Sequence, residues 1–341
     1  MDRAKILVAI DAAHSRGLEI GPLNRPVVSR DLGPVEYIDR ASTEELRKWY
    51  SINPEVNIDE IVQVDHVWGD QTLAECVGSE GAYDYLVASH VIEHVPDLFG
   101  WLREIASVLA DGGVAAFVVP DKRYTFDVLR RTSSDAELVD AYVRGLRRPD
   151  ARQIFDHFYG FRDLGSEAIR NGAAPGEVEP THPPRELMEL CRKVQASGEY
   201  IDSHCWVFTP ASFVDALDLG SRLGVLPFEI AALFPTETGA HEFFVSLRRL
   251  PRDMSPAAQR EAFLASRPQL DLAGEEPEPR LEEVVRRAAE AQHAAATRIG
   301  LLERRAAEAE ADAAAVRGST IWKLTAPLRR LVLMSRGQKG V

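Results

Sequence analysis

The polar residues of the segment SHVIEH, residues 89–94, follow a predicted buried strand at 84–89. In an open parallel sheet, the carboxyl ends of the strands form the edge at which ligands bind. The i, i+3, i+4 spacing of His90, Glu93 and His94 would place these side chains on one face of a helical turn. Two imidazoles and a carboxylate can bind a divalent metal ion. Alternatively, His94 acts as a general base, or the group caps the next helix and contacts a ligand.

Two acids and a glycine end two earlier predicted strands. Strand 17–21 ends in a Glu-Ile-Gly tripeptide that contains Glu19 and Gly21, and strand 35–39 ends in Asp39. The spacing of about 20 residues between the two acids is typical of a βαβ unit that presents a carboxylate to a ribose diol. Gly21 would let the backbone approach a ligand closely, because glycine has no Cβ. The sequence therefore predicts a nucleoside-binding edge.

A third group of polar residues follows the predicted strand at 113–119. Asp121 is a candidate base or hydrogen-bond acceptor for a substrate hydroxyl, and Arg123 could bind a phosphate or carboxylate beside Tyr124. The alternative is a capping salt bridge at the start of the next segment.

Two histidines with aromatic neighbours lie further along the chain. His157 stands in FDHFYG, and His204 in SHCWVFTP with Trp206. His157 is a further candidate base, whereas His204 and Trp206 could contact a sugar face. A histidine flanked by aromatic residues is also common in a protein core, and this alternative stays open.

The elements that must position these residues alternate between strand and helix patterns. The sequence predicts strands at 17–21, 35–39, 61–65, 84–89, 113–119, 228–234 and 241–248. It predicts helices at 3–15, 42–50, 70–77, 97–110 and 210–223. This order predicts an α/β fold with a Rossmann-like, mostly parallel sheet and helices on both faces. The last strand alternates and ends in charged residues, as an antiparallel edge strand does.

The chain divides into four predicted segments. They are a folded domain at 1–250 with a helical insertion or lid at 121–205, a Pro- and acid-rich linker at 251–280, a coiled-coil helix at 281–317, and a basic amphipathic tail at 318–341. Apolar residues recur every seven positions from Leu281 to Val316, which favours a coiled coil and a homo-oligomer over a solvated single helix. The tail has five basic residues and no acid, which suits an anionic membrane surface or an acidic partner. The alternative is a tail helix that packs on its own domain or on a dimer mate.

The composition excludes some classes of function. A net charge of −13 argues against nucleic acid as the main partner, because phosphate binding needs clustered Lys and Arg. The three cysteines, Cys76, Cys191 and Cys205, form no C-x-x-C pair, which suggests reduced thiols. There is neither a convincing signal peptide nor an apolar run of about 18 residues. We expect a cytoplasmic protein whose tail contacts the inner membrane face.

The order of the motifs resembles that of class I S-adenosylmethionine-dependent methyltransferases. The motifs are Glu-Ile-Gly, then Tyr-Ile-Asp at 37–39, Val-Asp at 64–65 and the run SHVIEHVPDLFGWLREIASVLADGG at 89–113. The resemblance covers residues 17–120, with a weaker extension to 250, and looks closest to the methyltransferases of bacterial surface-polysaccharide (O-antigen-type) biosynthesis. Only Gly21 remains of the usual glycine loop. The chain also lacks the G-x-G-x-x-G loop that a dehydrogenase needs.

The resemblance implies an S-adenosylmethionine site and assigns roles within it. The cofactor-binding residues would be Glu19, Gly21, Asp39, Asp65, Ser89 and His90. Glu19 would orient the glycine loop and face the sulfonium. Asp65, at the end of the third predicted strand, would bind the adenine amine beside Trp68.

The implied reaction is methyl transfer to a hydroxyl oxygen. A sugar hydroxyl is a poor acid, so the transfer needs a base or a metal ion. The candidate bases are His94, Asp121 and His157, and the candidate substrate contacts are Arg123, Tyr124, His204 and Trp206. The Glu-His pair also resembles the Glu-x-x-Glu-His metal site of small-RNA and quinone-biosynthesis O-methyltransferases. His90 replaces its first glutamate, which favours softer metals over magnesium.

The expected acceptor is a nucleotide-linked sugar or a lipid-linked glycan. Two alternatives remain. One is methylation of a small metabolite, a quinone-type compound or a nitrogen. The other is a non-catalytic scaffold that keeps a degenerate cofactor fold and works through its coiled coil. The reduced glycine loop favours the scaffold, whereas acids at three successive strand ends argue against it.

Overall fold

The computed structural model describes residues 2–163, 165–170 and 181–270, together with positions 298, 300, 304, 305, 307 and 315. The chain forms two units, Met1–Leu272 and Ala273–Val341. The six described positions of the second unit are helical. The predicted coiled coil otherwise lies outside the described residues, as does the whole basic tail. Oligomerisation and membrane contact therefore stay predictions.

The first unit is built on a seven-stranded sheet with the order β3-β2-β1-β4-β5-β7-β6. The strands are β1 (Gly17–Ile20), β2 (Val35–Asp39), β3 (His66–Val67), β4 (Tyr83–Ser89), β5 (Leu109–Pro120), β6 (Phe228–Phe234) and β7 (Glu242–Arg249). Strands β1 to β5 pair in parallel, and β7 runs antiparallel to both of its neighbours. The predicted Rossmann-like methyltransferase sheet with an antiparallel last strand is confirmed.

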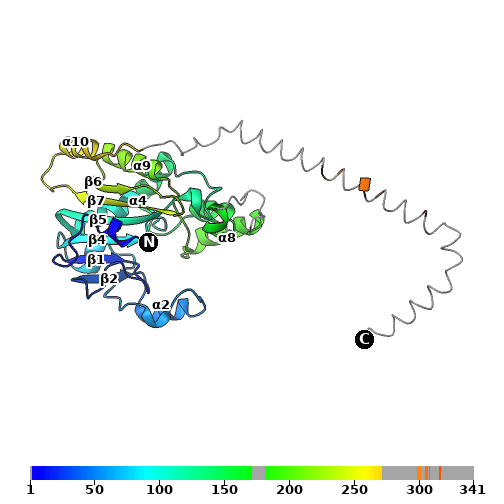
Figure 1. The fold of residues 1–341 in the computed structure, drawn as a ribbon, viewed down its shortest axis with the longest axis horizontal. Coiled ribbons are helices and arrows are strands. Elements are labelled where there is room, and N and C mark those ends of the chain that lie inside the picture. Colours follow the sequence, from blue (N-terminus) through cyan, green and yellow to red (C-terminus); the bar gives the residue numbers. More distant parts are fainter. Residues whose placement is uncertain are drawn as a thin grey trace. The chain divides into compact units, whose positions relative to one another are not determined.

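Helices precede, connect and follow these strands. They are α1 (Arg3–Ile6), α2 (Thr43–Tyr50), α3 (Leu73–Val77), α4 (Leu98–Val108), α5 (Asp135–Arg144), α6 (Ala151–Gly160), α7 (Ser166–Arg170), α8 (Pro184–Ser197), α9 (Pro210–Arg222) and α10 (Pro256–Ser266), with 3-10 turns at Ile58–Glu60 and Lys122–Tyr124. Figure 1 shows the strands stacked from β2 to β6, with α10 next to β6. The described part of 121–205 contains α5 to α8 and the second 3-10 turn.

The core lies on both faces of β4 and β5. Leu86 and Phe117 pack toward α4 with Leu102, whereas Tyr85 and Val118 belong to the cluster on the opposite face. Because side chains alternate along a strand, a strand that is buried on both faces reads as a continuous apolar run. This double burial leaves the strand ends as the place where polar side chains can gather.

The end of the helical segment crosses the carboxyl ends of β4 and β5. The backbone N–H of Cys205 donates to the carbonyl of Glu93 at 2.6 Å, and Lys122 N–H donates to Phe208 at 2.9 Å. Phe208 also forms an isolated bridge with Asp121. Residues 203–208 are therefore held against the two strand ends that carry the polar motifs.

Two predictions near the N-terminus are wrong. Helix α1 ends at Ile6 rather than at residue 15, and turns follow it. The third strand is not 61–65 but the short β3, because Ile61 and Val64 pack with Leu46 of α2 instead of pairing with β2.

Two predictions near the end of the first unit are also wrong. Strand β7 is not an edge strand but lies between β5 and β6, and almost all of its residues are buried. The predicted linker at 251–280 contains α10, whose Phe263 joins the main core. Among the described helices, none combines the length and the hydropathy that crossing a membrane requires.

We predict that Gly17→Ala destabilises the first unit. A Cβ at Gly17 would lie 1.9 Å from Cζ of Tyr85, whose ring is buried in the core. Overpacking of this kind costs about 1–3 kcal/mol, which denaturant unfolding followed by tryptophan fluorescence would measure. Gly165→Ala is the control, because nothing lies within 4 Å of a Cβ there. Equal effects of the two substitutions would contradict the prediction.

Candidate functional site

A cavity of about 900 Å³ lies at the carboxyl ends of β1, β2 and β4. Gly21, Asp39, Ser89 and His90, which end or follow these strands, line it. Small-molecule sites typically occupy about 300–1,000 Å³. Four of the predicted cofactor residues therefore share one ligand-sized cavity.

Gly21 makes the turn out of β1 at the cavity wall. Its φ of +66° is in the left-handed region, and its N–H donates to the carbonyl of Ile38 at 2.9 Å. A Cβ at this position would lie 3.1 Å from Cγ2 of Val91. Glycine is therefore required both for the backbone conformation and for the close approach of the β4 turn.

Glu19 does not line the cavity. Its carboxylate is 2% exposed and accepts hydrogen bonds from the backbone N–H groups of Val27 and Val28, at 2.6 and 2.9 Å. Burial raises the pKa of Glu19 to about 7, although these two N–H groups oppose the shift. Glu19 holds the loop that follows Gly21, as predicted, but the prediction that it faces the sulfonium is not supported.

Asp39 ends β2 at the cavity wall, as predicted. Its Oδ1 accepts from the backbone N–H of Arg40 at 2.7 Å. Burial raises the pKa of Asp39 above its usual value, and the Arg40 N–H opposes this shift. A carboxylate in this position can accept hydrogen bonds from the two hydroxyls of a ribose.

Asp65 does not line the cavity, so its predicted adenine contact is not supported. Its carboxylate accepts from Arg30 Nη2 at 2.7 Å and from the backbone N–H of Tyr37 at 2.7 Å. The reason is that Asp65 precedes β3 instead of ending it. Trp68 and Gly69, which follow β3, line the cavity instead.

Residues 90–94 form turns rather than a helical face. His90 has a φ of +53°, and its Nε2 is hydrogen-bonded to Oε2 of Glu242 at 2.8 Å. Burial alone would lower the pKa of His90, but the bond to Glu242 and the negative charges of Glu93 and Glu242 together outweigh burial and raise the pKa. The segment is therefore not helical, although Nδ1 of His90 still approaches Glu93 while its Nε2 is bonded to Glu242 of β7.

Glu93 is buried between two imidazoles. Its Oε1 lies 3.6 Å from Nδ1 of His90 and 3.9 Å from Nε2 of His94. The residue is 1% exposed, whereas the His94 side chain is 30% exposed and lines the cavity. Of the three predicted bases, only His94 reaches the cavity wall.

Asp202 holds His94 from the other side. Its Oδ1 is 3.1 Å from Nδ1 of His94 and also accepts from the Tyr200 hydroxyl at 2.8 Å. Burial alone would lower the pKa of His94, but the bond to Asp202 and the charge of Glu93 outweigh it and raise the pKa. The guanidinium of Arg40 lies 4.5 Å from the ring centre of Tyr200. These contacts connect the Asp39 side of the cavity wall to His94.

His204 packs directly behind His94. The two rings form an edge-to-face pair with centroids 4.7 Å apart. Nδ1 of His204 is 2.5 Å from Oδ2 of Asp127, whose other oxygen accepts from Arg130 at 2.8 Å. Burial alone would raise the pKa of Asp127, but His204 and Arg130 together lower it to about 2. His204 supports the site from within the protein and does not line the cavity.

The prediction that His157 is a base is not supported. It lies among Phe126, Phe158 and Phe161, and its Nδ1 accepts from the backbone N–H of His204 at 3.2 Å. Burial lowers the pKa of His157 to about 3, so the ring is neutral. His157 is a core histidine that positions the His204 backbone.

Asp121, Arg123 and Tyr124 do not form a substrate site. Asp121 is fully buried, and Arg123 donates to both of its oxygens at 2.7–3.2 Å. The Thr236 hydroxyl donates to Asp121 at 2.7 Å, and the Arg123 guanidinium stacks on Tyr124. The capping salt bridge, which was the alternative for this segment, is the arrangement that the structure contains.

Trp206 is a core residue and not a sugar-stacking surface. It is 1% exposed, and its Nε1 donates to the carbonyl of Val95 at 2.6 Å. Together with the Cys205 N–H bond to Glu93, this contact fastens the 203–208 segment to the turn that carries His94.

The structure adds cavity residues that the sequence patterns missed. They are chiefly Arg40, Leu46, Tyr50, Trp101, Tyr142, Tyr200 and Asp202. Asp202 stands two residues before His204 in YIDSHCW, so a local search for acid and histidine pairs could have found it. Tyr50 and Tyr142 carry no such signal, because an isolated tyrosine on a helix is equally common in cores.

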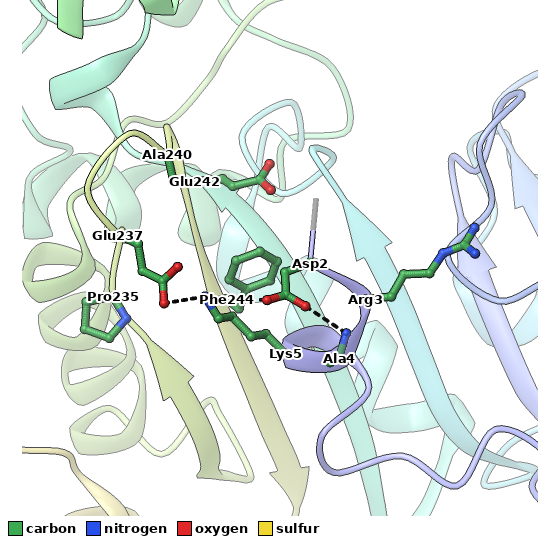
Figure 2. A pocket seen from close by; sticks show the side chains of 9 residues that line it. All are labelled: Asp2, Arg3, Ala4, Lys5, Pro235, Glu237, Ala240, Glu242 and Phe244. Carbon is green, nitrogen blue, oxygen red and sulfur yellow. Dashed lines mark hydrogen bonds and ion pairs between the residues drawn. The ribbon is translucent and has the colours of Figure 1, made fainter.

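A second pocket of about 660 Å³ lies beside α1 and β7 (Figure 2). Lys5 forms an ion pair with Glu237 at 2.6 Å, and its Nζ lies 5.6 Å from the ring centre of Phe244. Glu242 also lines this pocket and is bonded to His90 of the first cavity. Of the predicted site residues, none lines this second pocket.

The described histidines and acids form three groups with a spacing that suits a metal ion. The groups are His90, His241 and Glu242; Glu93, His94 and His204; and Asp127, His157 and His204. The predicted set of His90, Glu93 and His94 is not among them, because His90 turns toward Glu242.

One protein family matches the chain. A family model described as "Methyltransferase domain" matches residues 5–175, half of the chain. No curated protein matches.

Solved structures give weaker likenesses. An S-adenosylmethionine-dependent methyltransferase from Mesorhizobium loti is 13% identical, with 72% of this chain and 95% of that chain covered and a TM-score of 0.36. One from Methanosarcina mazei is 15% identical, with 72% and 96% covered and a TM-score of 0.35. One from Aquifex aeolicus is 13% identical, with 73% and 90% covered and a TM-score of 0.34. At such TM-scores, none of them says anything about the site.

We predict that Glu19→Gln reduces the pH dependence of stability. The folded-state pKa of Glu19 is raised from 4.5 to about 7, so its contribution is present below pH 4.5 and is lost as the pH rises through 7. Between pH 5 and 8, the stability advantage of wild type over Glu19→Gln should fall, by at most about 3 kcal/mol. Denaturant unfolding at both pH values measures the difference. An advantage that is equal at pH 5 and pH 8 would contradict the assignment.

Proposed function

Because the chain belongs to the methyltransferase domain family and is an S-adenosylmethionine-dependent methyltransferase, we propose that it methylates a hydroxyl oxygen of a sugar or glycan. The acceptor in this proposal is a nucleotide-linked sugar or a lipid-linked glycan of bacterial surface-polysaccharide biosynthesis. The motif order in the sequence supports this acceptor class, and the chemistry of the cavity wall supports oxygen as the methylated atom.

The cofactor is proposed to lie along the ends of β1, β2 and β4. Asp39 would accept hydrogen bonds from the ribose hydroxyls, and Trp68 would pack against the adenine. Gly21 would allow the methionine portion to approach the backbone. The methyl group would then face the β4 turn, where Ser89 and His90 line the cavity.

Methyl transfer is an in-line displacement at an already activated sulfonium. The protein therefore has to align the acceptor oxygen with the methyl group and to provide for the loss of the hydroxyl proton. Of the predicted bases, His94 is the one that lines the cavity, and we assign it this role, either as a base or as the ligand of a metal ion that acidifies the hydroxyl.

One observation carries the proposal: His94, held by Asp202, and Asp39 line the same cavity. A nitrogen acceptor can be delivered as a free amine and needs no such group. A histidine oriented by a carboxylate suits an acceptor that must lose a proton during the transfer.

The remaining cavity wall combines aromatic rings with polar groups. Tyr50, Tyr142 and Tyr200 line it, together with Arg40 and Arg103. Tyrosine offers an apolar face for the C–H side of a sugar and a hydroxyl for its polar edge. An apolar quinone would bind better to a cavity wall without these charged side chains.

The test is an acceptor screen with purified full-length protein and S-adenosylmethionine. We expect S-adenosylhomocysteine to form with at least one nucleotide sugar or lipid-linked glycan, and mass spectrometry should locate the new methyl group on oxygen. Quinols and amines form the comparison set. Turnover confined to the comparison set would replace the proposal by a small-metabolite methyltransferase. S-adenosylmethionine binding with no turnover on any acceptor would favour a scaffold.

We predict that Asp39→Ala lowers the affinity for S-adenosylmethionine about 10- to 100-fold, because hydrogen bonds to a charged group contribute about 1.5–3 kcal/mol. Isothermal titration calorimetry measures the affinity directly.

Asp65→Ala is the matched control for this measurement. It removes an acid of the same type at the neighbouring strand, but one that faces Arg30 outside the cavity. Its affinity should stay within about threefold of wild type, well inside the 1.4 kcal/mol of a tenfold change. If Asp65→Ala has the larger effect, the cofactor does not lie where we place it.

A further inference from the structure

A carboxylate and two imidazoles converge behind the cavity wall. Suitable ligand atoms of Glu93, His94 and His204 all lie within 4.8 Å of one another. We propose that these three residues form a binding site for a divalent transition-metal ion, with Zn²⁺ as the best match. The ion's role in methyl transfer rests on the function proposed above, but its binding does not.

The first observation is an unsatisfied carboxylate oxygen. Glu93 is 1% exposed, and its Oε2 has no hydrogen-bond partner among the residues that the structure describes. The imidazole nitrogens of His90 and His94 approach its other oxygen, at 3.6 and 3.9 Å, beyond hydrogen-bond distance. A buried carboxylate without partners is costly, and a bound cation would supply the missing partner.

The second observation is the orientation of the two imidazoles. Asp202 is bonded to Nδ1 of His94 at 3.1 Å, which leaves Nε2 facing Glu93. Asp127 is bonded to Nδ1 of His204 at 2.5 Å, which leaves Nε2 as the free nitrogen of that ring. A carboxylate that holds one ring nitrogen while the other binds the ion is the usual arrangement around metal-bound histidines.

The third observation is that the site is preorganised. The two segments that supply its ligands lie about 110 residues apart and are joined by several hydrogen bonds. Cys205 N–H donates to Glu93 at 2.6 Å, Cys205 Sγ donates to the carbonyl of His94 at 3.4 Å, and Trp206 Nε1 donates to Val95 at 2.6 Å. The positions of the ligands therefore do not depend on a bound ion.

Neither of the other two groups has a carboxylate that lacks a partner. In the first, Glu242 is already bonded to His90 at 2.8 Å. In the second, both oxygens of Asp127 are engaged, by Arg130 and His204. Only the Glu93 group combines convergent nitrogens with an unsatisfied oxygen.

The ligand set selects the type of ion. Two imidazoles and one carboxylate form a known catalytic zinc set, whereas Mg²⁺ prefers oxygen ligands. Zinc bonds of about 2.0–2.1 Å place tetrahedral ligands roughly 3.4 Å apart, close to the 3.9 Å between His94 Nε2 and Glu93 Oε1. His94 is part of the cavity wall, so an ion can enter there and present an open position to an acceptor hydroxyl, whose acidity it would increase.

The test is a Co²⁺ titration of chelator-treated full-length protein, without cofactor, followed by visible absorption and by the shift of the melting temperature. Zn²⁺ should compete for the same site. We expect Glu93→Gln to weaken Co²⁺ binding more than about 100-fold and Asp202→Asn to weaken it about 10- to 100-fold, because Asp202 positions His94. Asp202 is 59% exposed, so its substitution tests the site even if Glu93→Gln fails to fold.

Glu242→Gln is the matched control. It removes the carboxylate from the neighbouring His–Glu pair and should change Co²⁺ affinity less than about twofold, against the 10- to 100-fold expected for a residue that supports the site. The inference is overturned if wild type binds no Co²⁺, if Asp202→Asn binds as wild type does, or if Glu242→Gln has the largest effect.

The metal site and the acceptor class can fail separately. Methylation of a sugar hydroxyl that persists in excess chelator would overturn the metal's role and leave the proposed function standing. Co²⁺ binding with the expected variant pattern, but without turnover on any sugar, would retain the metal site and overturn the acceptor class.

Discussion

The contact on which the site depends is a backbone hydrogen bond between residues that are distant in the sequence. The N–H of Cys205 donates to the carbonyl of Glu93 at 2.6 Å and draws an extended segment across the ends of β4 and β5. Asp202 and His204 come just before Cys205 in the sequence, and they therefore contact His94 from two sides. Without it, the β4 turn would carry an isolated Glu-His pair. With this bond, Glu93 and His94 of the turn form a cluster with Asp202 and His204 at the cavity wall.

The buried acids of the first unit find hydrogen-bond partners in different ways. This difference distinguishes acids that stabilise the structure from acids that can bind a ligand. Backbone N–H groups satisfy Glu19, and arginines satisfy Asp121 and Asp127. A buried charge that is paired in this way maintains the structure. Asp39 borders the cavity, and one oxygen of Glu93 has no partner within the described residues, so these two acids still have hydrogen-bonding capacity to offer a ligand.

The sequence predicted the features that depend on local patterns. Residues within one strand or turn have side-chain directions set by the backbone period. The apolar runs therefore located the seven strands, although the third was misplaced by a few residues and the last was assigned to an edge. Gly21, Asp39, Ser89 and His90 reached the cavity because each directly ends or follows a parallel strand whose carboxyl end forms the binding edge.

The tertiary structure alone decided which polar residues are available for chemistry. In the sequence, Asp121 and His157 were candidate bases like His94. In the structure, Arg123 donates to Asp121, and aromatic rings enclose His157. Asp202 and His204 joined the site through contacts that span about 110 residues. Such pairings depend on how the helical segment packs across the strand ends, and no local pattern records that packing. The sequence by itself therefore determined the fold and the binding edge, whereas tertiary packing decided which candidate residues reach the cavity.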